Sequence, residues 1–384
     1  MGNDYFDDRK VKSNDIVNGV ARKDIFNQKG VLLVKEGTRI REAHYTQMRA
    51  DGLIQEDVET ASQASAAEKL NINYVSPTSV HGKLDKLITK FAQLQDSIIE
   101  EDFSGAKEEA IFIASSFIEL CQQNINQVLG ELYLSEPTKF SFIKPLYITA
   151  SMVELILRYN KFKEKEVVNA AMQQELAIAA LLYNIGFMIN NKKINTGTSN
   201  LSIEEKRNLK ANYSTESISV MQKLGFNNAT VIEALKNHHI SSQQPSLATS
   251  LLRTPFLYAN MSLMDADVSG SETMMNPCKR FAQLFSKKEL DPTMGGLFLK
   301  INGLFPIGSI IVFSSREKAL VIKGPEDSNI SSSTLRMLTN RSGIQLKKPG
   351  DKFLLTSTKL EQKGLADHHQ FAWSLFSPFT MWER

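Results

Sequence analysis

The stretch LLYNIGFMIN, residues 181–190, is apolar almost throughout and carries a polar pair, Tyr183-Asn184, in its middle. The apolar run predicts a buried helix that belongs to a longer helical segment over 164–190. A buried amide needs hydrogen-bond partners or costs about 1–3 kcal/mol. We therefore expect either that something satisfies Asn184, or that the pair stands where a more important group once stood.

Helical periodicity extends on both sides of this stretch. A three- and four-residue spacing, which marks one face of an amphipathic helix, is kept by Leu84, Leu87, Ile88, Phe91, Leu94 and Ile98. Further helical patterns cover 107–130, 141–160, 203–224, 229–239, 249–266 and 292–302. These segments together predict an all-helical domain over 81–305.

Short β-prone runs flank the helical segments. Residues 1–58 are typical of a small β-rich module, with a strand near 31–34 and a short helix that begins at 41 and ends near Gly52. The small, polar residues 59–80 predict a linker. The runs 309–313, 319–322 and 353–355 predict a β-rich appendix over 306–384. The expected fold class is therefore mainly α, a helical bundle with a small β-rich module at each end.

The last fifteen residues concentrate large aromatic side chains: Phe371, Trp373, Phe376, Phe379 and Trp382. Left in water, they would form an unusually apolar exposed patch. We therefore expect this tail to dock on its own chain, on a second copy or on a partner. Docking on its own β appendix or on an apolar helix face is favoured, because it requires no second molecule.

The composition is that of an ordinary globular protein of 384 residues, and its net charge of +3 gives no indication of nucleic-acid binding. The charged start MGNDYFDDRK predicts no secretory signal, and no run reaches the roughly 18 apolar residues typical of a membrane span. Two cysteines form no disulfide framework. A reducing cytosol is the simplest setting for such a chain.

Two neighbouring histidines, His238 and His239, end the helical segment in LKNHHI. Adjacent imidazoles on a chain with only six histidines could belong to a metal site. The alternative is a helix C-terminus, where an imidazolium meets the negative end of the helix dipole. From these two residues alone, the helix terminus is the favoured interpretation.

Three stretches taken together resemble the HD-GYP family, a branch of the HD phosphohydrolases: LLYNIGF, LKNHHI and DPTMGGLFLKINGLFPIGSIIVF (291–313). The family has LLHDIGK where this chain has LLYNIGF, and a YPVGS-like turn where this chain has residues 305–309. The resemblance covers residues 140–313. It implies a bacterial, cytoplasmic signalling protein whose active relatives hydrolyse cyclic di-GMP at two or three metal ions, usually iron or manganese.

The same resemblance implies that most metal ligands are missing here. The residues that fall on the family's ligand and pocket positions are Lys144, Tyr183, Asn184, Phe187, Tyr213 and Asn260. The histidine and aspartate of the family's name thus correspond to Tyr183 and Asn184. His238 and His239 are the remnants of the ligand set. The GYP loop is absent, with SSQQPSLATS (241–250) in its place.

Paired divalent ions require several anionic or imidazole ligands. Asn184 and Asn260 carry no charge, phenols are poor ligands near neutral pH, and an ammonium near a cation would repel it. Asp265 and Asp267 could be proposed as substitute ligands, but solvated residues at a helix end are the favoured interpretation.

Three functions remain open at this point. Ligand loss favours a catalytically inactive regulatory or scaffold protein that uses no cofactor and acts through a protein partner or as a homo-oligomer. The alternatives are a sensor that binds cyclic di-GMP or another nucleotide without cleaving it, and a residual metal-dependent phosphodiesterase with rearranged ligands.

Overall fold

The computed structural model describes residues 16–17, 20–21, 24–26, 32–36, 38, 44, 48, 79–135, 140–196, 202–240, 245–263, 277–287, 289–325, 329–366 and 381–382. The chain divides into two compact units, Met1–Pro77 and Thr78–Arg384. The boundaries expected from the sequence at residues 58, 80 and 305 stay predictions.

The first unit contains short antiparallel strands. β1 (Ile16–Val17) pairs with β2 (Val20–Ala21), and β3 (Ile25–Phe26) pairs with β4 (Leu32–Val34). Burial changes along β4 from an exposed Leu32 to a buried Val34, as expected for a strand with one covered face. The strand near 31–34 is thus confirmed, whereas the helix expected from 41 to about Gly52 lies outside the described residues apart from positions 44 and 48.

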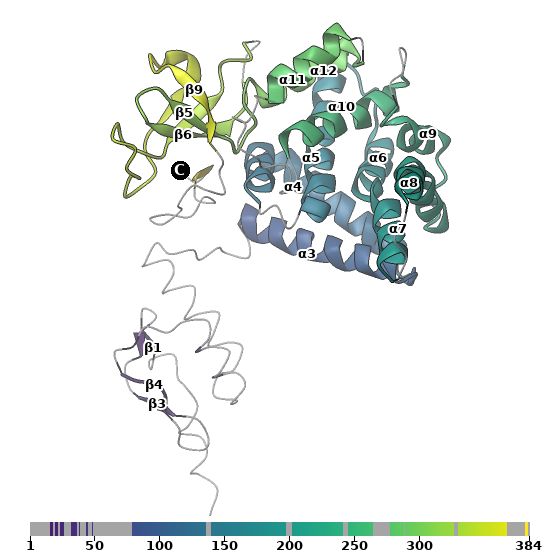
Figure 1. The fold of residues 1–384 in the computed structure, drawn as a ribbon, viewed down its shortest axis with the longest axis horizontal. Coiled ribbons are helices and arrows are strands. Elements are labelled where there is room, and N and C mark those ends of the chain that lie inside the picture. The colour runs from purple at the N-terminus through teal and green to yellow at the C-terminus, as the bar shows by residue number, and fades with distance from the viewer. Residues whose placement is uncertain are drawn as a thin grey trace, which may run out of the picture. The chain divides into compact units, whose positions relative to one another are not determined.

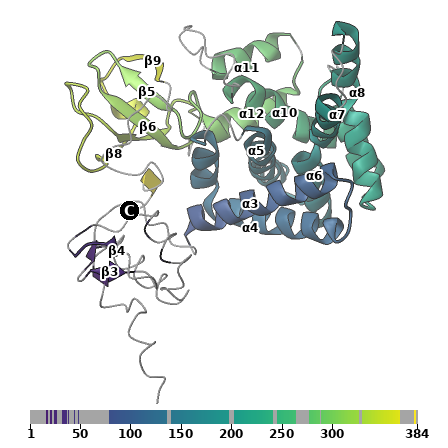
Figure 2. The same cartoon turned by 60° about the horizontal axis from the view of Figure 1, so that its bottom comes forward.

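The second unit begins with a helical bundle (Figure 1). Its helices are α3 (Val80–Ile99), α4 (Ala106–Tyr133), α5 (Phe140–Phe162), α6 (Ala170–Leu182), α7 (Ile185–Thr196), α8 (Ile203–Lys223), α9 (Ala229–Asn237), α10 (Leu247–Ser262), α11 (Pro277–Ser286) and α12 (Pro292–Asn302). Figure 2 shows α3 and α4 running side by side along one edge. α5 packs against α4, α6, α10 and α12, and nearly every residue from Ile143 to Val153 is buried. A helix that is apolar on all sides is expected to occupy such a central position.

The single helix expected over 164–190 is wrong. The chain forms two helices there, α6 and α7, with a break at Tyr183-Asn184. Residues 163–169 are not helical, and α6 begins after Asn169, whose side chain accepts the N–H of Met172. The sequence did not predict α11, and residues 264–266 of the helix expected over 249–266 lie outside the described ranges.

A five-stranded antiparallel sheet follows the bundle. Its strands are β5 (Ile310–Phe313), β6 (Lys318–Lys323), β7 (Thr334–Met337), β8 (Lys352–Leu354) and β9 (Gln362–Ala366), in the order β8-β7-β6-β5-β9. Alternate residues of β6 point to opposite faces: Ala319 and Val321 join the helical core, and Leu320 and Ile322 join a separate apolar cluster. The three expected strand regions are confirmed to within two residues, whereas β7 and β9 were not predicted.

Met381 and Trp382 pack on this second face of the sheet. Met381 is buried in the cluster, and the indole N–H of Trp382 donates to the carbonyl of Ile322 at 2.8 Å. Arg336 donates to the carbonyl of Met381 at 2.7 Å. The described end of the tail thus docks on its own chain, the favoured expectation. The expected contacts of Phe371, Trp373, Phe376 and Phe379 lie outside the described residues.

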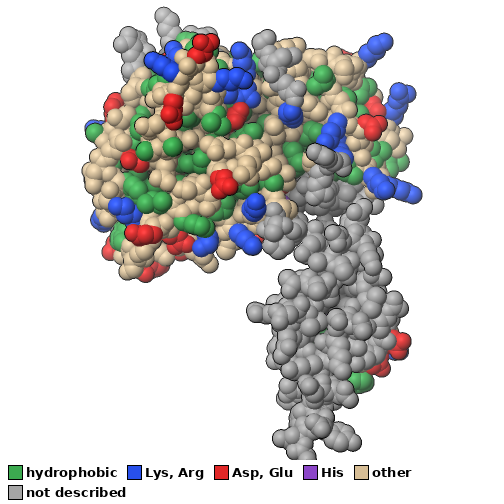
Figure 3. All heavy atoms as spheres, turned by 180° about the vertical axis from the view of Figure 1, so that it is seen from behind, with side chains coloured by type: hydrophobic (Ala, Val, Ile, Leu, Met, Phe, Trp, Pro, Cys, Tyr) green, Lys and Arg blue, Asp and Glu red, His purple; other side chains and the backbone are tan. Residues whose placement is uncertain are grey.

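The fold class expected from the sequence, mainly α with small β-rich parts, is confirmed. Among the described residues, no helix has the length and apolar character needed to cross a membrane. On the face drawn in Figure 3, lysine and arginine are interspersed with aspartate and glutamate over the second unit, so neither sign of charge dominates that face.

Candidate functional site

The polar pair Tyr183-Asn184 lies at a junction between two helices. Tyr183 ends α6, and the backbone carbonyl of Asn184 accepts the N–H groups of Phe187 at 3.0 Å and Met188 at 3.2 Å. The carbonyl of Asn184 thereby begins the hydrogen bonding of α7. The expectation that the pair sits inside a continuous buried helix is therefore corrected, since the two residues end one helix and start the next.

Ser217 on α8 satisfies the backbone at this break. Its hydroxyl donates to the carbonyl of Tyr183 at 2.9 Å and accepts the N–H of Gly186 at 3.0 Å. A Cβ at position 186 would lie 2.2 Å from the carbonyl oxygen of Tyr213, so only glycine lets α7 approach α8 this closely. The junction is thus held by backbone contacts to α8 and needs no metal ion to connect the two helices.

His238, immediately after α9, is fully buried and both of its ring nitrogens are engaged. Nδ1 lies 2.7 Å from the carbonyl of Leu235, which can only accept, so Nδ1 carries the hydrogen. Nε2 lies 2.9 Å from the hydroxyl of Tyr213. In the neutral ring Nε2 is an acceptor, and the phenol of Tyr213 donates to it.

Burial keeps both partners of this hydrogen bond neutral. Desolvation is the main cause that lowers the pKa of His238 to about 4. The hydrogen bond to Leu235 raises this pKa in part, and the charges of His239 and Arg253 lower it further. Desolvation also raises the pKa of Tyr213 to about 12. Near neutral pH the pair is therefore a phenol donating to an imidazole, and neither group carries a charge that would attract a cation.

Aromatic rings surround the imidazole of His238. Its ring centroid lies 4.6 Å from that of Phe256, 5.7 Å from that of Tyr183 and 5.1 Å from that of His239, each in an edge-to-face arrangement. Tyr213 in turn lies 5.6 Å from His239. Such arrangements are the favoured geometry for aromatic packing. His238 thus packs as a core aromatic residue.

A buried arginine adds positive charge beside the two histidines. The side chain of Arg253 on α10 is 3% exposed and donates to the backbone carbonyls of Ile240 and Glu289. Among the described residues it forms no ion pair with a carboxylate. Its charge contributes to the lowered pKa of both His238 and His239, which shows that it acts on this pocket electrostatically. A cation bound nearby would be repelled by the same charge.

The structure brings together four of the residues that the sequence singled out: Tyr183, Tyr213, His238 and His239. Asn184 directly follows Tyr183 at the break between α6 and α7 and is half-buried. The remaining three positions lie elsewhere on the surrounding helices. Lys144 is half-buried on α5, Phe187 is exposed on α7, and Asn260 is exposed on α10. Asp265 and Asp267 lie outside the described residues.

Sequence reasoning missed three contributors to the pocket: Ser217, Arg253 and Phe256. Ser217 follows Tyr213 by four residues, so both lie on one face of α8, and this spacing could have identified it. Arg253 is a single charge within the apolar run SLLRTPFLY, which is a signal for a buried cation with a specific environment. No signal in the sequence distinguishes Phe256 from any other core aromatic residue.

These residues do not fit the pair of iron or manganese ions that the family resemblance implies. Metal binding by His238 would require Nε2, whose lone pair already accepts from Tyr213. The described residues contain no group of three or more histidine, cysteine, aspartate or glutamate side chains arranged to hold a metal ion. The pocket can therefore pack rings and exchange hydrogen bonds, but it offers no carboxylate to bridge two metals.

No family model matches the chain, and no curated protein matches it. Among solved structures, an HDG"Y"P protein from Bdellovibrio bacteriovorus aligns with a TM-score of 0.42 and 12% sequence identity, over 76% of this chain and 96% of the other. The family assignment therefore rests on the motif residues and stays a proposal.

Proposed function

We propose that this chain is an HD-GYP-like regulatory or scaffold protein of bacterial signalling that has lost metal-dependent catalysis and acts by binding another protein. One observation carries the proposal: the phenol of Tyr213 occupies the nitrogen of His238 that a metal would use. The aromatic packing around His238 and the buried charge of Arg253 support it. Because function depends on the site and not on the fold, a helical scaffold without metal ligands is free to serve another purpose.

The proposal has a direct test in solution. The full-length protein, purified without a histidine tag, is incubated with cyclic di-GMP in the presence of Mn²⁺ or, without oxygen, Fe²⁺, and the products are separated by chromatography. We expect no linear dinucleotide and no GMP. Turnover that disappears in His238→Ala would overturn the proposal and favour the residual phosphodiesterase.

A second candidate, a sensor that binds cyclic di-GMP without cleaving it, is favoured by Arg253. Its guanidinium donates to two backbone carbonyls, feels the charge of Glu289 and forms no direct ion pair among the described residues, so this position suits an anion better than a cation. Calorimetry of the full-length protein with cyclic di-GMP separates the two candidates. Saturable binding that weakens in Arg253→Lys, with no product formed, would favour the sensor, and absence of binding would favour the scaffold.

A further inference from the structure

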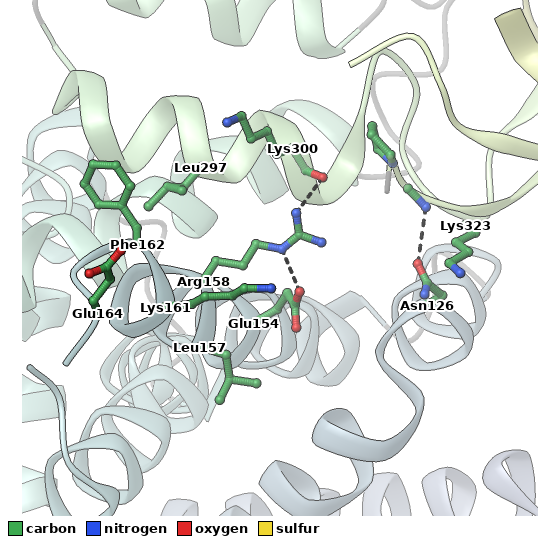
Figure 4. A pocket seen from close by; sticks show the side chains of 12 residues that line it. Asn126, Glu154, Leu157, Arg158, Lys161, Phe162, Glu164, Leu297, Lys300 and Lys323 are labelled. Atoms are coloured by element: carbon green, nitrogen blue, oxygen red, sulfur yellow. Dashed lines mark hydrogen bonds and ion pairs between the residues drawn. The ribbon is translucent and has the colours of Figure 1, made fainter. Parts of the chain in front are cut away.

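A cleft of about 790 Å³ opens between α5, α12 and the end of β6 (Figure 4). It shares no residue with the histidine pocket, by which we mean His238 and the side chains around it: Tyr183, Tyr213, His239, Arg253 and Phe256. Its volume falls within the range of about 300–1,000 Å³ that small-molecule sites occupy. Residues from α4, α5, α12 and the β6 end line it: Asn126, Glu154, Leu157, Arg158, Lys161, Phe162, Glu164, Leu297, Lys300, Lys323, Gly324 and Pro325.

Arg158 is fixed in position within this cleft. Its Nε donates to Glu154 at 2.7 Å, and its Nη1 donates to the backbone carbonyl of Lys300 at 2.9 Å. The second bond satisfies one of the last carbonyls of α12 and joins α5 to that helix. These two bonds use two of the five N–H donors of the guanidinium and fix its orientation. The three remaining N–H donors are therefore held in a set direction.

Two lysines add positive charge to the same part of the cleft. Lys161 lies one turn after Arg158 on α5, and Figure 4 shows both side chains extending in the same direction along the cleft. Lys323 lies across from them, beside Asn126. Lys161 is exposed and forms no ion pair within the described part of the chain. The side chain of Lys300 points away, so the converging groups are three cations and the carboxylate of Glu154.

The wall that carries Lys323 is tied to the helical bundle. The N–H of Gly324 donates to the side-chain oxygen of Asn126 on α4 at 3.2 Å. This bond connects the end of β6 to a helix, so the backbone next to Lys323 is anchored. The positive groups therefore stand on two elements, α5 and β6, and each of these is tied to a neighbouring helix, which reduces the ordering cost of binding an anion between them.

The other end of the cleft presents an aromatic ring beside a carboxylate. Phe162 and Leu297 lie there with Glu164 next to Phe162, and Phe162 is 56% exposed. In Figure 4 the ring of Phe162 and the side chain of Leu297 lie on one side of Arg158, and Lys323 lies on the other. A ligand matched to this layout has an anionic group at one end and a flat apolar group at the other.

We infer that this cleft binds a phosphorylated small molecule with a flat apolar group. The phosphate would accept from the outward N–H groups of Arg158 and from the ammonium groups of Lys161 and Lys323. The apolar group would lie against Phe162 and Leu297. This inference does not depend on the proposed function, because it uses none of the residues of the histidine pocket.

Adenosine monophosphate is a suitable probe, with adenosine and inorganic phosphate as the two halves measured alone. Calorimetry on the full-length protein at low ionic strength should show saturable binding of the nucleotide and weaker binding of either half. Added salt should weaken the binding of the nucleotide, because the attraction is between charges. The inference fails if the nucleotide binds no more tightly than adenosine.

Variants locate the binding in this cleft. Lys161→Gln changes an exposed side chain and should leave the melting temperature unchanged, and the double variant Lys161→Gln/Lys323→Gln should bind the nucleotide about tenfold more weakly. Phe162→Ala should lower the affinity for the nucleotide and leave the affinity for inorganic phosphate unchanged. Lys236→Gln is the matched control, since Lys236 is exposed on α9 near the histidine pocket. Equal nucleotide affinity in Lys161→Gln, the double variant and the wild type would overturn the assignment.

Discussion

The hydroxyl of Tyr213 on α8 lies 2.9 Å from Nε2 of His238, which follows α9. Since Nδ1 of the same ring donates to the carbonyl of Leu235, both nitrogens of His238 are used within the protein. The family that the sequence resembles requires this histidine as a metal ligand. On our proposal, the phenol has taken the place of that metal ion, and the histidine serves packing and hydrogen bonding.

Removing the phenol should destabilise the protein. Tyr213→Phe leaves Nε2 of His238 buried without its donor, which costs about 1–3 kcal/mol. The expected result is a lower melting temperature in calorimetry. Tyr159→Phe, a half-exposed tyrosine on α5, is the matched control and should change little. Equal stability of Tyr213→Phe and the wild type would show that the hydrogen bond contributes nothing.

Stability should fall in mild acid because of His238. Its pKa is about 4 in the folded protein against an ordinary value of 6.5, so the unfolded chain binds the proton more readily between these values. The contribution of neutral His238 to the free energy of unfolding is fully present above pH 6.5 and is lost as the pH falls towards 4. Urea unfolding at pH 7 and pH 4.5 measures the loss. His238→Asn, which keeps a donor for Leu235, should lose less stability over this interval, and an identical loss in the variant would contradict the assignment.

Restoring the family's pair at positions 183 and 184 should not restore a metal site. Tyr183→His removes a ring that packs against His238 and Phe256, while an aspartate at 184 is partly stabilised by the N-terminus of α7. We expect a melting temperature lowered by the equivalent of about 1–3 kcal/mol and no hydrolysis of cyclic di-GMP. A double variant that binds metal and keeps its stability would show that other ligands remain.

The C-terminal docking has a test that uses two glycines. A Cβ at Gly130 would lie 2.0 Å from a ring carbon of Trp382, whereas nothing lies within 4 Å of a Cβ at Gly296. In helices, glycine to alanine is ordinarily favourable by about 1 kcal/mol. Gly296→Ala should therefore raise the melting temperature, and Gly130→Ala should lower it. When Trp382→Ala is also present, Gly130→Ala should no longer lower the melting temperature. A melting temperature that still falls would contradict the docking of Trp382.

The sequence predicted most helices, because their apolar faces repeat at helical spacing over two or more turns. It failed at Tyr183-Asn184, where both flanking segments are buried and the apolar pattern continues across the break. The break is set by Ser217, a residue more than thirty positions away that bonds to both sides of it. Local periodicity contains no information about such a contact.

The candidate site was predicted in outline only. The family resemblance singled out Tyr183, Tyr213 and His238, but the hydrogen bond between the last two depends on how α8 and α9 pack. The cleft at Arg158 was not predicted at all, because its cations come from α5 and β6, which are separated by more than 150 residues. The spacing of residue types along one helix predicts which face of that helix is buried. It does not predict a cleft whose side chains come from different helices and strands.

The metal content of the full-length protein tests the loss of the metal site most directly. The protein is purified without a histidine tag, incubated with Mn²⁺ or anaerobically with Fe²⁺, separated from unbound ions and measured by plasma mass spectrometry. We predict well below one metal ion per chain, with no difference between the wild type and His238→Ala/His239→Ala. One or more ions per wild-type chain, lost in that double variant, would contradict the proposal that Tyr213 has replaced the metal.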